Sequence, residues 1–363
     1  MENNFEEEMK QKIKELRTKS VVRILAIETS CDETSVAVVE NGRKVLSNII
    51  SSQIDIHTRF GGVVPEIASR NHLLAINPLI ERALDEAKLT LDDIDALAVT
   101  QGAGLVGALL VGVTAAKALS YALKKPLIAV NHIKGHIAAN FIAHPDLEPP
   151  FCCLITSGGH TAIVEVVEFN KFVMLGTTQD DAIGEAFDKV ARIVGLGYPG
   201  GPKIDKIAKG QKGTIKFVEH DAFENTFDVS YSGLKTAVIN YVHKNEQNGT
   251  DLDIPNICAS FQKQAVEMLA HKAIKACIKL KLDTIVLAGG VAANSYLRDT
   301  MLELGKKNNI EIKFPPIELC GDNAAMIGSL AYFNLNTDDP ASLSLTAKSS
   351  FLMIASMIKS ILI

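Results

Sequence analysis

The sequence predicts an α/β protein built from two similar halves, each a mixed sheet flanked by helices. Apolar runs of strand length alternate with stretches of helical periodicity, which is typical of this class. Two segments of one design, RILAIETSCDETSVAVV (23–39) and FCCLITSGGHTAIVEVV (151–167), begin about 128 residues apart. Each has an apolar strand, a polar turn and a second strand, so each predicts a β-hairpin. This weak internal repeat indicates a duplicated architecture.

The remaining elements follow in order along each half. The first half is expected to contain a helix over 72–89, a strand over 94–99, the turn TQGAGLVG and a helix ending near Leu123, the strand PLIAV, and NHIKGHIAAN (131–140). The second half is expected to contain a helix near 181–194, the loop GLGYPGGPKID, a helix over 255–280, the strand TIVLAGG, and a helix from Ser295.

Proline-rich HPDLEPP (144–150) is the best candidate for the link between the halves. The expected organisation is an N-terminal extension (1–22), lobe I (23–147), lobe II (148–321), a C-terminal helix (322–348) that is free to return to lobe I, and an apolar tail (349–363). The charged first twenty residues predict a solvated helix or a disordered lead-in rather than a secretory signal. The tail FLMIASMIKSILI is too short for a membrane span and contains Lys359.

Composition indicates a globular chain rather than a disordered or strongly basic one. The 363 residues are 47% hydrophobic and 22% charged, which is ordinary for a globular chain, and the net charge is −5. Any nucleic-acid contact must therefore come from a local basic patch or from a partner subunit. The six cysteines have no CxxC spacing, so they predict a reducing cytoplasm rather than a disulfide framework.

Two glycine-rich segments predict ligand contacts in the second half. The turn TSGGH (156–160) offers unobstructed backbone amides and a hydroxyl, which suits a phosphate, although an ordinary hairpin turn remains open. The similar turn at Thr29, Ser30 and Asp32 favours the phosphate interpretation. In LAGGVAAN (287–294), Asn294 could cap the next helix or contact an adenine edge. Asp188 and Asp205 are candidates for ribose hydroxyls or for surface acids.

Three side chains predict a metal site. In NHIKGHIAAN, His132 and His136 are four residues apart, which places them on one face of a helix. In CGDNAAMIG, Asp322 stands at a loop-to-helix junction, where it could cap the helix or supply a third ligand. A zinc protease of the HExxH type needs glutamate beside the first histidine, and Ile133 stands there instead, which disfavours a metalloprotease.

Six motifs in fixed order carry a resemblance that covers Arg23 to Phe333. They are PLIAVNHIKGHIAA, TSGGHT, GEAFDKVARIVGLGYPGGPKID, SGLKTAV, LAGGVAAN and CGDNAAMIG. Together they resemble the bacterial tRNA N6-adenosine threonylcarbamoyltransferase family (TsaD, formerly called O-sialoglycoprotein endopeptidase). The resemblance departs at Ala103, where the family pattern usually has proline, and at the tail beyond about Lys348.

The resemblance implies a fold, a reaction and a site. The fold would be actin-like and sugar-kinase-like (ASKHA), with duplicated RNase H-like lobes around a nucleotide cleft. The reaction would transfer threonylcarbamoyl from L-threonylcarbamoyladenylate to N6 of adenosine 37 in tRNAs that read codons beginning with A. The metal would be Fe²⁺, or alternatively Zn²⁺, on His132, His136 and Asp322. The adenylate would be held by Ile155, Thr156, Ser157, Gly158, Gly159, Asp188, Gly201, Asp205 and Asn294.

The resemblance also implies partners, namely tRNA, a paralogous TsaB-like subunit and a TsaE-like small ATPase. The helix over 102–123 is a plausible contact surface for the paralogue, or simply a core helix. No residue is identified as a general base. The main alternative is an actin-like ATPase or sugar kinase, which shares the fold but needs no histidine pair. A non-catalytic scaffold subunit would be expected to lack the ligand set that this chain has.

Overall fold

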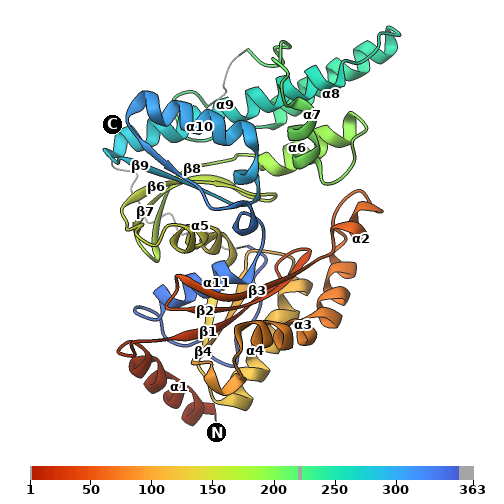
Figure 1. The fold of residues 1–363 in the computed structure, drawn as a ribbon. Helices are drawn as coiled ribbons and strands as arrows, with labels where there is room; N and C mark the ends of the chain where they lie inside the picture. The colour runs from red at the N-terminus through yellow and green to blue at the C-terminus, as the bar shows by residue number, and fades with distance from the viewer. Residues whose placement is uncertain (1, 220–222, 351–363) are drawn as a thin grey trace. The chain divides into compact units, whose positions relative to one another are not determined.

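The structure is a computed structural model that describes residues 2–219 and 223–350 (Figure 1). The described chain forms two compact units. Unit 1 contains residues 2–148 and 321–350, and unit 2 contains residues 149–219 and 223–320. The apolar tail predicted over 349–363 lies outside the described residues from 351 onward.

Each unit is built on one five-stranded mixed sheet. Unit 1 has strands β1 (Arg23–Glu28), β2 (Glu33–Glu40), β3 (Lys44–Ser52), β4 (Ala96–Gly102) and β5 (Leu127–Asn131), in the order β3-β2-β1-β4-β5. Unit 2 has strands β6 (Phe151–Thr156), β7 (Thr161–Glu168), β8 (Lys171–Thr177), β9 (Thr284–Ala288) and β10 (Glu311–Lys313), in the order β8-β7-β6-β9-β10.

The two sheets also share their strand directions. In each sheet the first three strands along the chain form antiparallel pairs, and the last two run parallel to the first. The central strands β1 and β6 are buried along nearly their whole length because both faces are covered. The predicted duplication is therefore confirmed at the level of topology.

Helices cover both sheets. The helices of unit 1 are α1 (Glu2–Leu16), α2 (Ile54–Thr58), α3 (Pro65–Ala87), α4 (Val106–Leu123), α5 (His132–Ala143) and α11 (Ala324–Asn334). The charged N-terminal extension is thus helical, and it packs through buried Met9 and Ile13. Helix α11 packs against α5, β1 and β2, which brings residue 322 beside the histidine segment (Figure 1).

The helices of unit 2 are α6 (Ile183–Ile193), α7 (Gly200–Ala208), α8 (Ser232–Gln247), α9 (Ile254–Leu280) and α10 (Ser295–Asn308). Short 3₁₀ turns also occur at Leu91–Asp93, Gly290–Ala293 and Ile317–Leu319. Helix α9 runs through the middle of the hydrophobic core and contacts α7 and α10.

Two expectations about elements were wrong. The segment GLGYPGGPKID is not all loop, because Pro199 precedes a helix that starts at Gly200. Prolines are tolerated near a helix start, where backbone N–H groups have no intrahelical acceptor. Helix α3 begins at Pro65 rather than at 72, and its exposed Leu73 and Leu74 belong to its outer face.

Helix α4 has the length and apolar composition of a membrane span, and it is the one helix in the described part of the chain that does. About 39% of it is buried, with Leu109 and Val113 facing the core of unit 1. Core helices meet the same criteria, so this is weak evidence for a span.

Candidate functional site

The two predicted metal-binding histidines lie on one face of α5. Asn131 caps this helix, because its side-chain oxygen accepts a hydrogen bond from the Lys134 backbone N–H at 3.0 Å. His132 is therefore the first helical residue, and His136 follows one turn later. The two rings meet edge to face, with centroids 4.6 Å apart, and both side chains are buried.

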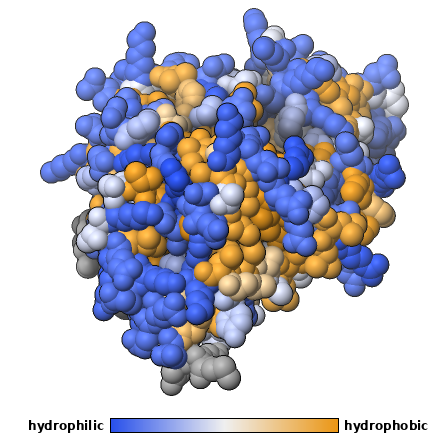
Figure 2. Space-filling view, turned by 60° about the horizontal axis from the view of Figure 1, so that its bottom comes forward, coloured by the Kyte–Doolittle hydropathy of each residue, from blue (hydrophilic) through white to orange (hydrophobic). Residues whose placement is uncertain are grey.

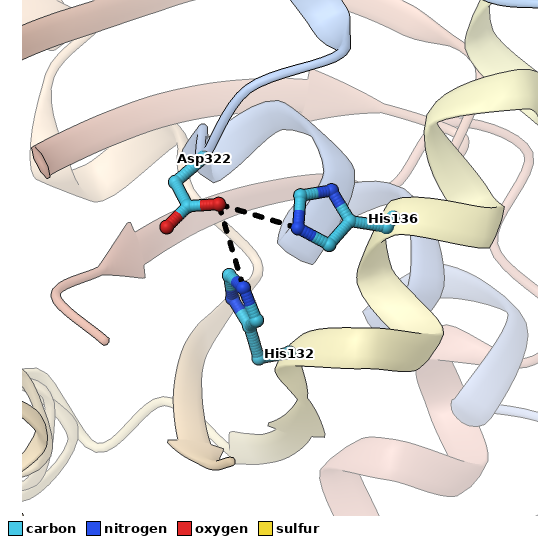
Figure 3. A group of neighbouring side chains, drawn as sticks. All are labelled: His132, His136 and Asp322. Atoms are coloured by element: carbon cyan, nitrogen blue, oxygen red, sulfur yellow. Dashed lines mark ion pairs between the residues drawn. The ribbon is translucent and has the colours of Figure 1, made fainter. Parts of the chain in front are cut away.

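The third predicted ligand, Asp322, faces both histidines (Figure 3). Its Oδ1 lies 3.2 Å from His136 Nε2 and 3.4 Å from His132 Nε2. The capping alternative for Asp322 is wrong, because Asn323 caps α11 by accepting from the Met326 N–H at 3.0 Å. The Asp322 carboxylate is thus left to face the histidines.

These three side chains fit a divalent metal. Their ligand atoms all lie within 4.8 Å of one another. Donors bound tetrahedrally at about 2.0–2.1 Å would be separated by about 3.3 Å, close to the distances seen here. In the described chain neither ring nitrogen of buried His136 has a hydrogen-bond partner, since its short approach to Asp322 is not directed as a hydrogen bond. A cation bound at Nε2 would satisfy that one nitrogen of the buried ring.

Glu28, which the sequence reasoning missed, supports His132 from behind. This carboxylate ends β1, is fully buried, and places Oε2 3.2 Å from His132 Nδ1. Its other oxygen accepts the Ser30 backbone N–H at 2.5 Å. A carboxylate on Nδ1 favours the tautomer that presents an unprotonated Nε2 to a metal. The available signal was an acidic residue directly after the apolar run ILAI of this strand.

The charges of this group are strongly coupled. Burial alone would lower the pKa of His132, but Asp322 and Glu28 outweigh it and raise that pKa well above its usual value. Burial opposes ionisation of Asp322 as well, yet His132 and His136 hold the pKa of Asp322 well below its usual range. Burial also opposes ionisation of Glu28, but the neighbouring His132 outweighs it and lowers the pKa of Glu28. Because metal and proton compete for an imidazole, metal binding would displace a proton here.

The turn after β6 in unit 2 is open. Ser157 closes it, because its N–H donates to the His160 carbonyl at 2.8 Å and its hydroxyl accepts from the His160 N–H at 3.0 Å. Gly158 and Gly159 are exposed, and a Cβ on either would have no heavy atom within 4 Å. Among the described residues their N–H groups have no acceptor.

The start of α6 lies directly against this turn. A Cβ on Gly184, in the first turn of α6, would lie only 2.7 Å from the Gly158 Cα. A helix N-terminus carries partial positive charge and free N–H groups, so helix and turn together suit a bound anion.

The end of β9 lies beside the same turn. Thr156 is buried and donates through its hydroxyl to the Ala288 carbonyl at 3.2 Å, and Ile155 pairs with Ala288 between the strands. Gly289 has a φ of +92°, and a Cβ there would lie 2.5 Å from the Thr156 carbonyl oxygen. Glycine is therefore required for these two segments to approach each other.

The remaining predicted residues of unit 2 link α6, α7 and α10. Asp188 accepts the Gly200 N–H at 2.6 Å, next to Gly201, whose Cβ position is open. Asp205 accepts from the Ser295 N–H at 3.1 Å and the Ser295 hydroxyl at 2.8 Å. The two acids thus bridge helices.

Asn294 does act as a helix cap. Its side-chain oxygen accepts the Leu297 N–H at 2.9 Å, and its amide donates to the Gln262 side-chain oxygen at 2.8 Å. A separate cavity of about 560 Å³ in unit 2, lined in part by Leu234, Met268 and Lys272, includes none of the predicted site residues.

Solved structures of low sequence identity share the fold of this chain. HypF from T. kodakarensis matches with a TM-score of 0.60 at 14% identity, covering 87% of this chain and 48% of that one. The Acidaminococcus fermentans (R)-2-hydroxyglutaryl-CoA dehydratase component A matches with a TM-score of 0.52 at 14% identity, covering 87% and 100%. These likenesses show the fold alone, and it is the predicted actin-like, sugar-kinase-like one.

The sequence comparisons are more specific. The family model described as TsaD, tRNA N6-adenosine threonylcarbamoyltransferase, matches residues 44–329. A protein of that name from Clostridium perfringens is 61% identical, covering 90% of this chain and 96% of its own length. Another from Clostridium botulinum is 58% identical, covering 91% and 97%. The chain belongs to the tRNA N6-adenosine threonylcarbamoyltransferase family.

Proposed function

We propose that this chain transfers the threonylcarbamoyl group of L-threonylcarbamoyladenylate to N6 of adenosine 37 in tRNAs that read codons beginning with A. The products are threonylcarbamoyladenosine in the tRNA and free AMP. The observation that carries the proposal is the cluster of buried His132, buried His136 and half-buried Asp322 in a member of this family. The open glycine turn in unit 2 supports it, because it offers a place for the adenylate phosphate.

The adenylate phosphate is assigned to the turn formed by Ser157, Gly158 and Gly159, with Ile155 and Thr156 beneath it. Asp188, Gly201, Asp205 and Asn294 are assigned to the ribose and base. The donor is a mixed anhydride with AMP as a good leaving group, so a covalent protein intermediate is unnecessary. Orientation and charge stabilisation then supply most of the rate.

The metal is assigned to His132, His136 and Asp322, with Fe²⁺ proposed and Zn²⁺ as the alternative, since imidazole and carboxylate donors suit both. Three protein ligands leave coordination positions open, and a bound cation would stabilise negative charge on donor oxygens. Glu28, which lies against His132 Nδ1, would orient the Nε2 of that ring toward a bound cation. The N6 amine forms a bond to the carbamoyl carbon, the bond from that carbon to the phosphate oxygen breaks, and the amine loses a proton.

A TsaB-like paralogue and a TsaE-like ATPase are proposed as partners in the cytoplasm, where all six cysteines would stay free as they are here. Helices α3 and α4 present exposed apolar side chains for the paralogue: Leu73, Leu74, Val106, Leu110 and Tyr121. Apolar surface gathers on the face of the protein seen in Figure 2. A charged residue at Leu74, which is 77% exposed, should block this association without unfolding unit 1.

The proposal is tested by incubating the chain and its partners with L-threonylcarbamoyladenylate and a tRNA that reads an A-starting codon. Modified adenosine should appear, and a tRNA with guanosine at position 37 should give none. An actin-like ATPase or sugar kinase would instead hydrolyse ATP without tRNA and would not need the metal. That outcome, with no modified nucleoside, would reject the proposed function.

A further inference from the structure

A short stretch of unit 2 is strongly basic in a chain whose net charge is −5. Between residues 200 and 218 it contains one acid, Asp205, and the following lysines: Lys203, Lys206, Lys209, Lys212 and Lys216. They recur every three or four residues along α7 and the segment after it. An acidic protein that binds a nucleic acid needs a locally basic surface, and this stretch provides one.

Helix α7 separates its lysines from its buried face. Ile204 and Ala208 are buried in the core. Lys203 is used within the protein, because its Nζ donates to the carbonyls of Leu196 at 2.9 Å and Tyr198 at 3.0 Å. Lys206, within the helix, and Lys209, just after its end, are exposed.

The segment after α7 is fixed by three side chains of α9. The Asn256 oxygen accepts the Thr214 N–H at 2.9 Å, the Ser260 hydroxyl accepts the Ile215 N–H at 3.0 Å, and the Gln264 oxygen accepts the N–H groups of Phe217 and Val218 at 3.0 and 3.1 Å.

Asn256, Ser260 and Gln264 are spaced four residues apart, so they form one row along α9. Gly213 allows the close approach, since a Cβ there would lie 2.9 Å from the Ala259 backbone. The backbone that carries Lys212 and Lys216 is therefore held in place before any ligand binds, which reduces the ordering cost of binding.

Few acids oppose these lysines. Asp205 is engaged by Ser295, and Lys216 pairs with Glu219 at 3.0 Å between two exposed side chains. Lys206, Lys209 and Lys212 have no ion pair within the residues that the structure describes. These three exposed side chains, called the lysine row below, are available to an external anion.

We propose that the lysine row, Lys206, Lys209 and Lys212, binds the sugar–phosphate backbone of the tRNA substrate. The inference rests on the proposed function, and it adds a surface that neither the metal cluster nor the glycine turn contains. Lysines act as point charges that suit phosphates without sequence preference. Helix α7 also carries Gly201 and Asp205, so the row would place tRNA phosphates next to the proposed donor site.

The test compares two triple variants of the full-length chain. Lys206→Gln/Lys209→Gln/Lys212→Gln removes the row, and Lys244→Gln/Lys306→Gln/Lys307→Gln removes the same charge from three other exposed lysines of unit 2. Fluorescence anisotropy measures the affinity for a labelled tRNA across a series of salt concentrations. The magnitude of the slope of log affinity against log salt should fall by about 2 to 3 for the row variant, at about 0.7 to 0.9 per phosphate contact, and by less than about 1 for the control.

At about 0.1 M salt the row variant should bind tRNA at least tenfold more weakly than the wild type, while both variants bind AMP normally. Equal weakening in the two variants, or no tRNA binding by the wild type, would overturn the proposal. Loss of activity with unchanged tRNA affinity would overturn it too, in favour of an acidic protein partner. Because AMP and tRNA binding are measured without turnover, failure here is separable from failure of the transfer reaction.

Discussion

The turn after β1 and the turn after β6 occupy equivalent places in the two duplicated sheets, yet their surroundings differ after the first two residues. Both turns begin buried, with Thr29 and Thr156 each 0% exposed. The first turn stays filled, since Asp32 is 6% exposed and Thr29 donates to the Ala108 carbonyl. Ser30 contacts His132 Nδ1 at 3.1 Å. The second turn is open around Gly158 and Gly159. One copy of the motif thus contacts a proposed metal ligand, and the other leaves backbone amides open to a proposed anion.

The largest effect should come from the metal cluster beside the filled turn. His136→Ala removes one of the three proposed ligands, so the purified protein should lose its metal and transfer should fall about 100-fold or more. AMP affinity should not change, because the open turn lies in unit 2. His144→Ala, at the end of the same helix, is the matched control and should keep both metal and activity. Full metal content and full activity in His136→Ala would contradict the ligand assignment.

Glu28→Gln tests the support behind His132. The side chain keeps its shape but loses the charge that faces His132 Nδ1 at 3.2 Å. Metal affinity, measured by competition with a chelator, should fall about 10–100-fold. Unchanged metal affinity would show that Glu28 fills space without orienting the histidine.

Metal binding by His132, His136 and Asp322 should also depend on pH. The pKa of His132 is raised in the metal-free protein by Asp322 and Glu28 acting against burial, so the imidazole keeps its proton to higher pH than usual. Protons therefore compete more strongly as pH falls, and apparent metal affinity should drop about tenfold per pH unit below that pKa. Chelator competition at several pH values measures this slope. Affinity that does not vary with pH would contradict the coupling.

The smallest effects should come from glycine substitutions, which test separately whether each turn contributes to stability or to AMP binding. Gly159→Ala has open space for its Cβ, so the free energy of unfolding should change by less than about 0.5 kcal/mol, while AMP affinity falls about tenfold. Gly104→Ala would place its Cβ 2.5 Å from the Ser30 carbonyl oxygen, so it should destabilise unit 1 by about 1–3 kcal/mol and leave AMP affinity unchanged. Denaturant melts and AMP titration of both variants give the two quantities. If Gly159→Ala lost stability and Gly104→Ala lost AMP affinity instead, the assignment of the anion site to the turn in unit 2 would be wrong.

Much of this could be predicted from the sequence because it depends on local patterns. The hairpin repeat predicted two similar sheets, and the spacing of His132 and His136 predicted one helical face. Contacts between distant segments could not be predicted in the same way. Glu28 stands 104 residues from His132, and its role depends on how β1 and α5 come together. The turns at Thr29 and Thr156 begin alike, with both threonines 0% exposed, and they diverge where Asp32 is buried and Gly158 and Gly159 are exposed. Sequence similarity did not predict that divergence, because it depends on what packs against each turn.

Local patterns also left alternatives that only the structure resolves. Asp322 and Asn323 are both good helix caps by residue type, and the backbone at the start of α11 makes Asn323 the cap. Asn294 is likewise a cap, with its amide bonded to Gln262. Such choices depend on backbone geometry and partners that residue type alone does not specify.

The most direct test of the account combines metal and product in one experiment. Wild-type chain and His136→Ala, each with the partner proteins, are incubated with L-threonylcarbamoyladenylate and tRNA, and the tRNA is digested for nucleoside analysis. The account predicts threonylcarbamoyladenosine from the wild type, its loss when a chelator removes the metal, its return when Fe²⁺ or Zn²⁺ is restored, and almost none from His136→Ala. The account would be contradicted if the chelated wild type and His136→Ala both formed as much threonylcarbamoyladenosine as the untreated wild type.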